Sequence, residues 1–277
     1  MPELPEMQAL AERLDRMYGQ ARFLQPQVLQ FSGLKTVSPD PSDVAGRTVT
    51  GVGRRGKFLV LELGGPRVLV HLSQGGRVDI EDPPKVTGKK MGVVRFLFEN
   101  RPSMLVKEFG TQRKAGWWVL AEGDDGPLTK LGPDPFSNDF EEFVKTSDDR
   151  RQLHNLLKDQ RTVAGIGRGF ADDILHRARL SPFGKLATLD LEQRLGLVNA
   201  TREVLTEAIG RERERTGGLP TKLSGRFQVH GAADSECPAC ADTLASVSFE
   251  GNLLVYCPSC QTRGKRLADR RLSKLLK

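Results

Sequence analysis

The segment Cys237-Pro-Ala-Cys240 is followed after 16 residues by Cys257-Pro-Ser-Cys260, and together the two segments contain all four cysteines of the chain. A two-residue spacer lets both thiolates of a pair face one tetrahedral ion, and 16 residues suffice for a hairpin between the pairs. Four thiolates close the coordination sphere and leave no position for a catalytic water. We therefore predict a structural Zn²⁺ site.

The chain before this cluster falls into two parts with different patterns. Residues 4–18 carry apolar side chains at helical intervals, and short runs rich in Val, Leu and Phe follow, bounded by Gly or Pro. After Leu131-Gly-Pro-Asp-Pro135 the pattern becomes helical, and Gly217-Gly218 follows the last helix. The predicted strands are 48–53, 57–63, 67–72, 93–98, 103–107 and 117–120, and the predicted helices are 138–146, 149–157, 166–179 and 189–211.

These patterns predict an α+β multidomain protein. An N-terminal helix and a β-sandwich occupy 1–130, a linker 131–148, a helical domain 149–225, a zinc hairpin 226–262 and a basic tail 263–277. The hairpin strands are expected at 246–249 and 253–256, with the turn at 250–252.

Composition and charge narrow the class of protein. Of 277 residues, 38% are hydrophobic and 28% charged, which is typical of a folded protein, and every apolar run is too short to cross a membrane. The amino terminus has acids where a secretion signal has bases, so we expect a cytoplasmic, nucleoid-associated protein. Residues 261–277 hold seven bases and one acid, and the other 260 residues have a net charge of only +1. Such a tail suits a phosphate backbone, an acidic partner or a solvated helix end.

The chain start, Met1-Pro2-Glu3-Leu4-Pro5, is by itself a good helix beginning. A small second residue normally permits removal of Met1, which would free the secondary amine of Pro2. A chain-terminal amine has a pKa of about 7.7 to 8, against about 10.4 for lysine, so far more of it is uncharged at neutral pH. It is therefore the better nucleophile toward a sugar aldehyde or imine.

Several motifs together resemble the formamidopyrimidine-DNA glycosylase and endonuclease VIII family of repair enzymes. They occur in the family's order and span nearly the whole chain. They are Pro2-Glu-Leu-Pro-Glu6, Arg54-Arg-Gly-Lys57, His71-Leu72, Leu131-Gly-Pro-Asp-Pro135, the segment Asp159-Gln-Arg-Thr-Val-Ala-Gly-Ile-Gly167 with Ala171-Asp-Asp173 and Ser181-Pro182, and the two cysteine pairs. The resemblance implies a β-sandwich joined to a helix-two-turn-helix domain with a zinc hairpin, acting as a monomer on damaged DNA, duplex or locally unpaired.

The resemblance also implies a mechanism. The enzyme flips a damaged nucleotide out of the duplex. Pro2 attacks its anomeric carbon, expels the base and leaves a Schiff base, and elimination then cuts the strand. Glu3 protonates the deoxyribose ring oxygen. Lys57 contacts the phosphate beside the lesion, although alone it is an ordinary basic hairpin turn. The catalytic residues implied are Pro2, Glu3, Glu6 and Lys57.

A second set of residues is implied to bind DNA. Gly165 and Gly167 at a helix entrance let backbone amides approach a phosphate. The family grips that phosphate with an Asn and an Arg, where this chain has Arg168 and Asn252. These are interpreted as an exchange of roles, with independent drift as the alternative. The complete implied set is His71, Gln74, Arg113, Lys114, Gly165, Gly167, Arg168 and Asn252.

The gap-filling wedge of the family is also changed. Its Met, Arg and Phe correspond here to Gln74, Arg113 and Ala115, so the aromatic side chain is missing. Trp117 or Trp118 could replace it, unless both are core residues, or the enzyme could act where bases are already unpaired. About eight residues separate Gly218 from Phe227, too few for a long lid over an everted base. We therefore expect oxidised pyrimidines, ring-opened or bulky alkylated bases, or bare abasic sites, rather than oxidised guanine.

Three functions remain open from the sequence. The first is a bifunctional glycosylase and abasic-site lyase. The second is a non-catalytic binder of damaged or branched DNA with the same fold, and the third is a zinc-ribbon protein that binds RNA or a protein through its basic tail. Covalent trapping on abasic DNA separates the first from the others, and a preference for lesion DNA separates the second from the third.

Overall fold

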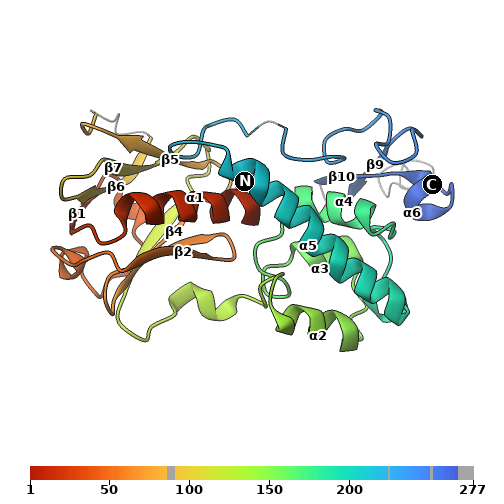
Figure 1. The fold of residues 1–277 in the computed structure, drawn as a ribbon, viewed down its shortest axis with the longest axis horizontal. Coiled ribbons are helices and arrows are strands. Elements are labelled where there is room, and N and C mark those ends of the chain that lie inside the picture. Colours follow the sequence, from red (N-terminus) through yellow and green to blue (C-terminus); the bar gives the residue numbers. More distant parts are fainter. Residues whose placement is uncertain (86–90, 224, 250–251, 268–277) are drawn as a thin grey trace. The chain divides into compact units, whose positions relative to one another are not determined.

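The computed structural model describes residues 1–85, 91–223, 225–249 and 252–267 (Figure 1). It divides into two compact units. The first is made of Met1–Lys130 and Ala208–Leu223, and the second of Leu131–Glu207 and Ser224–Lys277. The division falls inside helix α5 (Leu191–Arg213). No helix within the described ranges is long and apolar enough to span a bilayer.

The first unit contains two four-stranded sheets whose neighbouring strands are all antiparallel. One sheet has the order β2-β3-β4-β8 and the other the order β1-β6-β7-β5. The strands are β1 (Phe23–Val28), β2 (Gly51–Arg55), β3 (Phe58–Glu62), β4 (Arg67–His71), β5 (Gly76–Glu81), β6 (Gly92–Phe98), β7 (Ser103–Glu108) and β8 (Gly116–Leu120).

The two sheets share one core, because strands with alternating side chains can each bury one face. Leu59 and Val70 from the first sheet belong to the same buried cluster as Phe96 and Val106 from the second. Helix α1 (Leu4–Tyr18) adds its apolar face to this cluster. The Tyr18 ring at its end stacks on the Phe98 ring, with the two ring centroids 3.9 Å apart. The predicted sandwich with an N-terminal helix is therefore present, and the predicted bounds of the helix, 4–18, match α1.

The second unit is helical before it reaches the cysteine hairpin. Arg194 of α5 is buried and its guanidinium donates hydrogen bonds to the carbonyls of Val144, Lys145 and Ser147, which ties α5 to the end of α2 (Asn138–Thr146). The other elements of this unit are α3 (Leu153–Lys158), α4 (Arg168–Arg177), β9 (Ala245–Phe249), β10 (Asn252–Tyr256) and α6 (Pro258–Thr262). This composition confirms the predicted α+β multidomain class.

Some boundaries differ from the sequence prediction. The stretch 131–148, predicted as a linker, holds α2 and belongs to the second unit, where Phe140 and Val144 are buried. Residues 208–223, predicted within the helical domain, belong to the first unit. The strands β1 and β5 were not predicted, and both are edge strands of one sheet. An edge strand faces solvent on more sides, so it lacks the continuous apolar run of a central strand.

Candidate active site and nucleic-acid interface

The amino-terminal residues enter helix α1 in a fixed geometry. Glu3 is the N-cap residue, and its backbone amide donates to the Glu6 carboxylate at 2.7 Å. Pro5 has no amide hydrogen to satisfy, so the first turn suits it. Pro2 is buried, and the side chains of Glu3 and Glu6 are 4% and 1% exposed. Glu6 therefore holds the backbone that carries Pro2 and Glu3.

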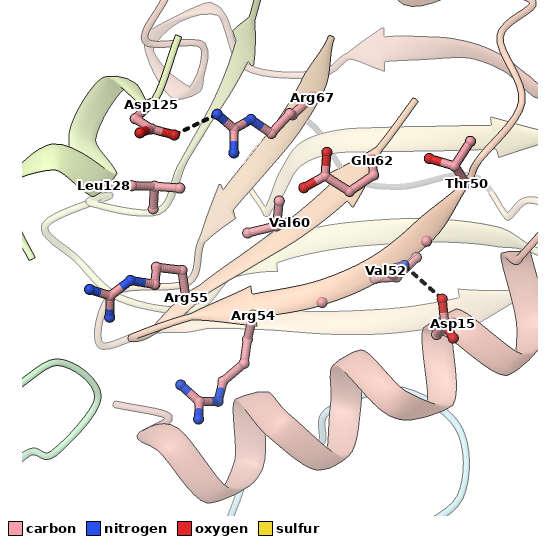
Figure 2. A pocket seen from close by; sticks show the side chains of 12 residues that line it. Asp15, Thr50, Val52, Arg54, Arg55, Val60, Glu62, Arg67, Asp125 and Leu128 are labelled. Atoms are coloured by element: carbon pink, nitrogen blue, oxygen red, sulfur yellow. Dashed lines mark hydrogen bonds and ion pairs between the residues drawn. The ribbon is translucent and has the colours of Figure 1, made fainter. Parts of the chain in front are cut away.

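Helix α1 runs antiparallel to β2. Near the end of the helix, the Asp15 carboxylate accepts a hydrogen bond from the Val52 amide at 2.7 Å. Near its start, Arg54 Nε donates to Gln8 Oε1 at 2.8 Å. Figure 2 shows the Asp15–Val52 contact near one end of the helix and the Arg54 side chain near the other. The first turn of α1 is thus directed toward the end of β2, where the turn that carries Lys57 begins.

Lys57 and His71 form the second part of this region. Lys57 is 5% exposed and follows Gly56, whose φ of 56° lies in the region that favours glycine. His71 pairs across the sheet with Phe58, and the two rings lie 4.7 Å apart. Burial, and secondarily the positive charge of Lys57, lower the pKa of His71 to about 4. His71 is therefore uncharged at neutral pH beside a buried ammonium group.

The residues predicted to enter DNA lie in two loops and differ in exposure. Gln74, Arg113 and Lys114 are exposed, and Arg113 has a φ of 42°. Ala115, at the position of the missing aromatic wedge, is 1% exposed, and its amide donates to the Glu108 carboxylate at 2.8 Å. Ala115 is thus part of the loop's frame and has no surface to offer a base.

Neither tryptophan can replace the wedge. Trp117 is fully buried in the sandwich core, where its ring meets Phe96 edge-on at 5.6 Å. Trp118 faces the other side of the sheet and packs edge-on against Phe58 at 5.5 Å. The suggestion that a tryptophan fills the gap is therefore wrong. Strand alternation places one in each of two apolar clusters, which the sequence pattern did not resolve.

Two glycines, Gly165 and Gly167, lie just before helix α4. Gly167 is its N-cap residue, and Arg168, which is exposed, is its first residue. Gly165 has a φ of 102°, and its amide donates to Gln160 Oε1 at 2.9 Å. The Gly165 amide thus has an acceptor within the protein, and the part of Gly165 in letting other backbone amides approach a phosphate stays a prediction. The positive φ explains why glycine is needed there.

Two buried aspartates of α4 organise the zinc hairpin region, a role that sequence reasoning missed. Asp173 accepts hydrogen bonds from three consecutive amides, those of Gln228, Val229 and His230, at 2.8 to 3.2 Å. Burial raises the pKa of Asp173, although these hydrogen bonds oppose the shift. Asp172 accepts from His230 Nδ1 at 2.6 Å and from the Val255 amide of β10 at 3.1 Å. The only sequence signal was the adjacent acidic pair in a helix.

The four cysteines lie together, with all their sulfur atoms within 4.8 Å of one another. The Sγ atom of Cys260 lies 3.4 Å from that of Cys240 and 3.9 Å from that of Cys237, and the Sγ atoms of Cys240 and Cys257 are 3.5 Å apart. Tetrahedral bonds of about 2.3 Å to zinc place sulfur atoms roughly 3.8 Å apart, so this donor set fits the ion. His176 Nε2 lies 3.1 Å from the Cys237 sulfur and is buried behind it. The predicted structural Zn²⁺ site is confirmed, with ligands Cys237, Cys240, Cys257 and Cys260.

Two predicted features reach beyond the described residues. Asn252 begins β10, but its side chain lies outside the described part, so its proposed DNA contact has no structural counterpart. Of the basic tail, only the beginning is described. There the Leu267 amide donates to the Tyr256 hydroxyl at 2.7 Å, and Leu267 packs against the hairpin cluster. Residues 268–277 lie outside the described ranges.

The segment after α5 is fastened to the first unit. The Leu219 amide donates to the Val78 carbonyl of β5 at 2.7 Å. Arg13 of α1, which is 8% exposed, donates to the carbonyls of Gly217 at 3.0 Å and Glu212 at 2.9 Å. Arg77 similarly reaches the Pro220 and Thr221 carbonyls. This part of the segment is therefore an extension of the sheet edge.

A shallow pocket lies on the outer face of β2, β3 and β4 (Figure 2). Its lining carries both signs of charge, and Arg67 there pairs with Asp125. Because the lining alternates in charge, it does not define one class of ligand.

Comparison with known proteins decides the family. The model of the formamidopyrimidine-DNA glycosylase N-terminal domain matches residues 1–118, and the model of the H2TH domain of the same glycosylase matches residues 131–218. The formamidopyrimidine-DNA glycosylase of Thermus thermophilus is 33% identical over 285 residues, which cover 95% of this chain and 100% of the relative. The chain belongs to the formamidopyrimidine-DNA glycosylase family.

Solved structures of glycosylases agree with this assignment. The Thermus thermophilus glycosylase crystal structure is 30% identical, with a TM-score of 0.77 over 94% of this chain and 98% of that chain. The Lactococcus lactis glycosylase bound non-covalently to DNA with an abasic site has a TM-score of 0.81 over 94% and 99% of the two chains, and at 22% identity it supports the fold alone. The predicted DNA glycosylase class, which implies base-excision repair, is thus confirmed.

Proposed function

We propose that this glycosylase also cleaves abasic sites, with the secondary amine of Pro2 as its nucleophile once Met1 is removed. The observation that carries the proposal is the buried Pro2-Glu3 pair at the start of α1, in the helix whose first turn is directed toward the Lys57 turn. Burial and the positive end of a helix both disfavour a protonated amine. The uncharged, nucleophilic form is therefore favoured at this position.

The proposed reaction proceeds through a covalent intermediate. The Pro2 nitrogen bonds to the anomeric carbon of the damaged nucleotide, and the bond from that carbon to the base breaks. Glu3 donates a proton to the ring oxygen, which opens the sugar and leaves a Schiff base. Removal of a proton from the neighbouring carbon then expels the 3′ phosphate and cuts the strand. Glu6 holds the Glu3 backbone in place, at 2.7 Å from its amide.

Lys57 and His71 are proposed to bind the phosphate beside the lesion. Lys57 supplies a buried positive charge, and a neutral His71 can donate one hydrogen bond without carrying charge itself. In the other unit, Gly167 and the exposed Arg168 at the start of α4 are proposed to contact a phosphate, since the helix N-terminus favours an anion. Gln74, Arg113, Lys114 and Asn252 complete the proposed DNA contacts.

The proposed substrates are oxidised pyrimidines and ring-opened or bulky alkylated bases, in preference to oxidised guanine. Support comes from the segment after α5, which has eight residues between Gly218 and Phe227. Its first part is fastened to β5 through Leu219 and to α1 through Arg13. A segment so short and so anchored cannot form a long lid over an everted base.

The alternative is a non-catalytic protein of this fold that binds damaged or branched DNA. The buried Ala115 favours this alternative, because it stands where the family has its aromatic wedge and offers no ring to stack on a base. Such a protein binds lesion DNA tightly but forms no covalent species with it.

Borohydride trapping on abasic-site DNA separates the two functions. The mature protein, with Met1 absent by mass spectrometry, is expected to give a covalent complex with a duplex that contains one abasic site. A matched preparation with one additional residue ahead of Pro2 is expected to bind the same duplex and give no complex. Tight binding without trapping by the mature protein would establish the non-catalytic alternative.

A further inference from the structure

Two loops at one end of the sandwich are locked together. One loop, residues 72–75, joins β4 to β5, and the other, residues 109–115, joins β7 to β8. The Phe109 amide donates to the Gly75 carbonyl at 3.0 Å. A Cβ atom added to Gly75 would lie 2.4 Å from the Gly110 nitrogen, so the two backbones touch directly. The loops therefore form a single platform.

The longer loop is held in shape from inside. Glu108, which is 6% exposed, accepts a hydrogen bond from the Ala115 amide at 2.8 Å and so closes the loop at its two ends. Burying that carboxylate is favourable only because amide hydrogen bonding compensates for the lost water. Residues between the two ends are consequently presented on a fixed frame.

The Phe109 side chain stands on this platform and is 42% exposed. Apart from Leu72, which is buried in the sandwich core, the other residues of both loops are polar or small. The exposed ring of Phe109 is therefore not explained by packing in the sandwich. The ammonium of Lys107 lies 5.2 Å from the ring centroid, and Arg113 and Lys114 are exposed farther along the same loop. Exposed aromatic rings among cations are the pattern with which proteins stack on nucleic-acid bases while binding the adjacent phosphates.

We propose that Phe109 stacks on a base beside the everted nucleotide and is the apolar wedge of this enzyme. The inference rests on the proposed action on damaged DNA. It assigns to Phe109 the role that Ala115 and the two tryptophans cannot fill, because all three lie in the packed structure. An aromatic ring stacked in the vacated gap slows the return of the flipped nucleotide.

The test is a binding titration on a duplex that contains one tetrahydrofuran site, compared with an intact duplex of the same sequence. Tetrahydrofuran has no aldehyde, so the result does not depend on Pro2 chemistry. Phe109→Ala is expected to raise Kd for the tetrahydrofuran duplex by roughly 5- to 150-fold, the usual range for one lost aromatic stack, and to change Kd for the intact duplex by less than about twofold. Phe109→Trp is expected to keep the wild-type preference.

Leu24→Ala is the matched control, because Leu24 is an apolar residue of similar exposure, 39%. It lies on β1, at the edge of the β1-β6-β7-β5 sheet that is far from β5 and its loop. It is expected to leave both Kd values unchanged. The inference is overturned if Phe109→Ala stays within about twofold of wild type on the tetrahydrofuran duplex, or if it weakens both duplexes equally. Failure of borohydride trapping, by contrast, overturns the lyase proposal and leaves this titration valid.

Discussion

The Asp172 carboxylate lies 2.6 Å from Nδ1 of His230, a residue 58 positions later in the chain. Asp172 is 1% exposed, and it also accepts from the Val255 amide of β10. His154 Nε2 of α3 lies 3.2 Å from its other oxygen. One side chain of α4 thus joins the helical region and the zinc hairpin within the second unit.

Asp172→Ala is expected to destabilise the second unit by about 3 kcal/mol, since it leaves buried donors without their acceptor. Asp148→Ala, at an exposed position in the same unit, is expected to change stability by less than about 0.5 kcal/mol. Urea unfolding followed by circular dichroism measures both. Equal stabilities of the two variants would contradict the joining role of Asp172.

The pKa of His71, about 4, predicts a pH dependence of stability. The unfolded chain takes up a proton near the ordinary value of about 6.5, whereas the folded chain takes it up only near 4. The stability of the first unit is therefore full above pH 6.5 and falls as pH drops toward 4, by about 3 kcal/mol from this one group. His71→Gln should flatten the corresponding part of the stability profile between pH 7 and 4. An unchanged profile would show that His71 protonates equally in both states.

Removal of zinc is expected to unfold the hairpin. Structural zinc sites of this kind contribute on the order of 10 kcal/mol to folding, which exceeds what a small hairpin core provides. Elemental analysis should find about one zinc per chain, and Cys260→Ser should reduce this content and lower the unfolding temperature. Ser246→Ala, at an exposed position of β9, serves as the control and should retain the metal. Full zinc content in the Cys260→Ser protein would be inconsistent with four-thiolate coordination.

Arg13 should control how firmly the segment after α5 is held. Arg13→Ala removes the donors to the Gly217 and Glu212 carbonyls, so exchange of the Leu219 amide hydrogen should accelerate at least about tenfold. Arg16→Ala, an exposed change on the same helix, should leave that exchange rate unaltered. Hydrogen exchange resolved at single residues makes the comparison. If both variants exchange as slowly as wild type, Arg13 does not anchor the segment.

Arg168 and Asn252 should contribute unequally to DNA binding. Arg168→Ala removes a charge and is expected to lower the slope of log Kd against log salt concentration by about one. Asn252→Ala removes only neutral hydrogen bonds. The affinity loss for lesion DNA should therefore be larger for the arginine. Titrations at several salt concentrations measure both quantities, and equal losses refute the exchange of roles between the two positions.

The sequence predicted those elements whose pattern is set locally. Helix α1 carries its own apolar period and a proline-containing first turn, and the central strands are continuous apolar runs. The edge strands β1 and β5 were missed, because β1 contains Pro26 and β5 alternates charged with apolar residues. Helix α3 starts at Leu153 rather than 149, since the Asp149 carbonyl is used by the Ala187 amide.

The sequence predicts those parts of the candidate site that form a local motif, such as Pro2-Glu3, the turn with Lys57 and the cysteine pairs. The parts that it did not predict depend on contacts between residues that are distant in the sequence. The anchoring of Gly217 by Arg13 spans 204 positions, and the carboxylate contacts of Asp172 and Asp173 span more than 50. No local pattern encodes such pairings. The packing of the two tryptophans, with Trp117 buried and Trp118 partly buried, likewise depends on there being an apolar cluster on each side of one sheet.

The most direct test of the central claim is to locate the bond formed with DNA. The mature enzyme is trapped with borohydride on an abasic-site duplex, digested and sequenced by mass spectrometry. The account predicts that the reduced sugar adduct lies on the nitrogen of Pro2 in the peptide at the chain start. An adduct on Lys57 or another lysine, or active protein that still carries Met1, would contradict it.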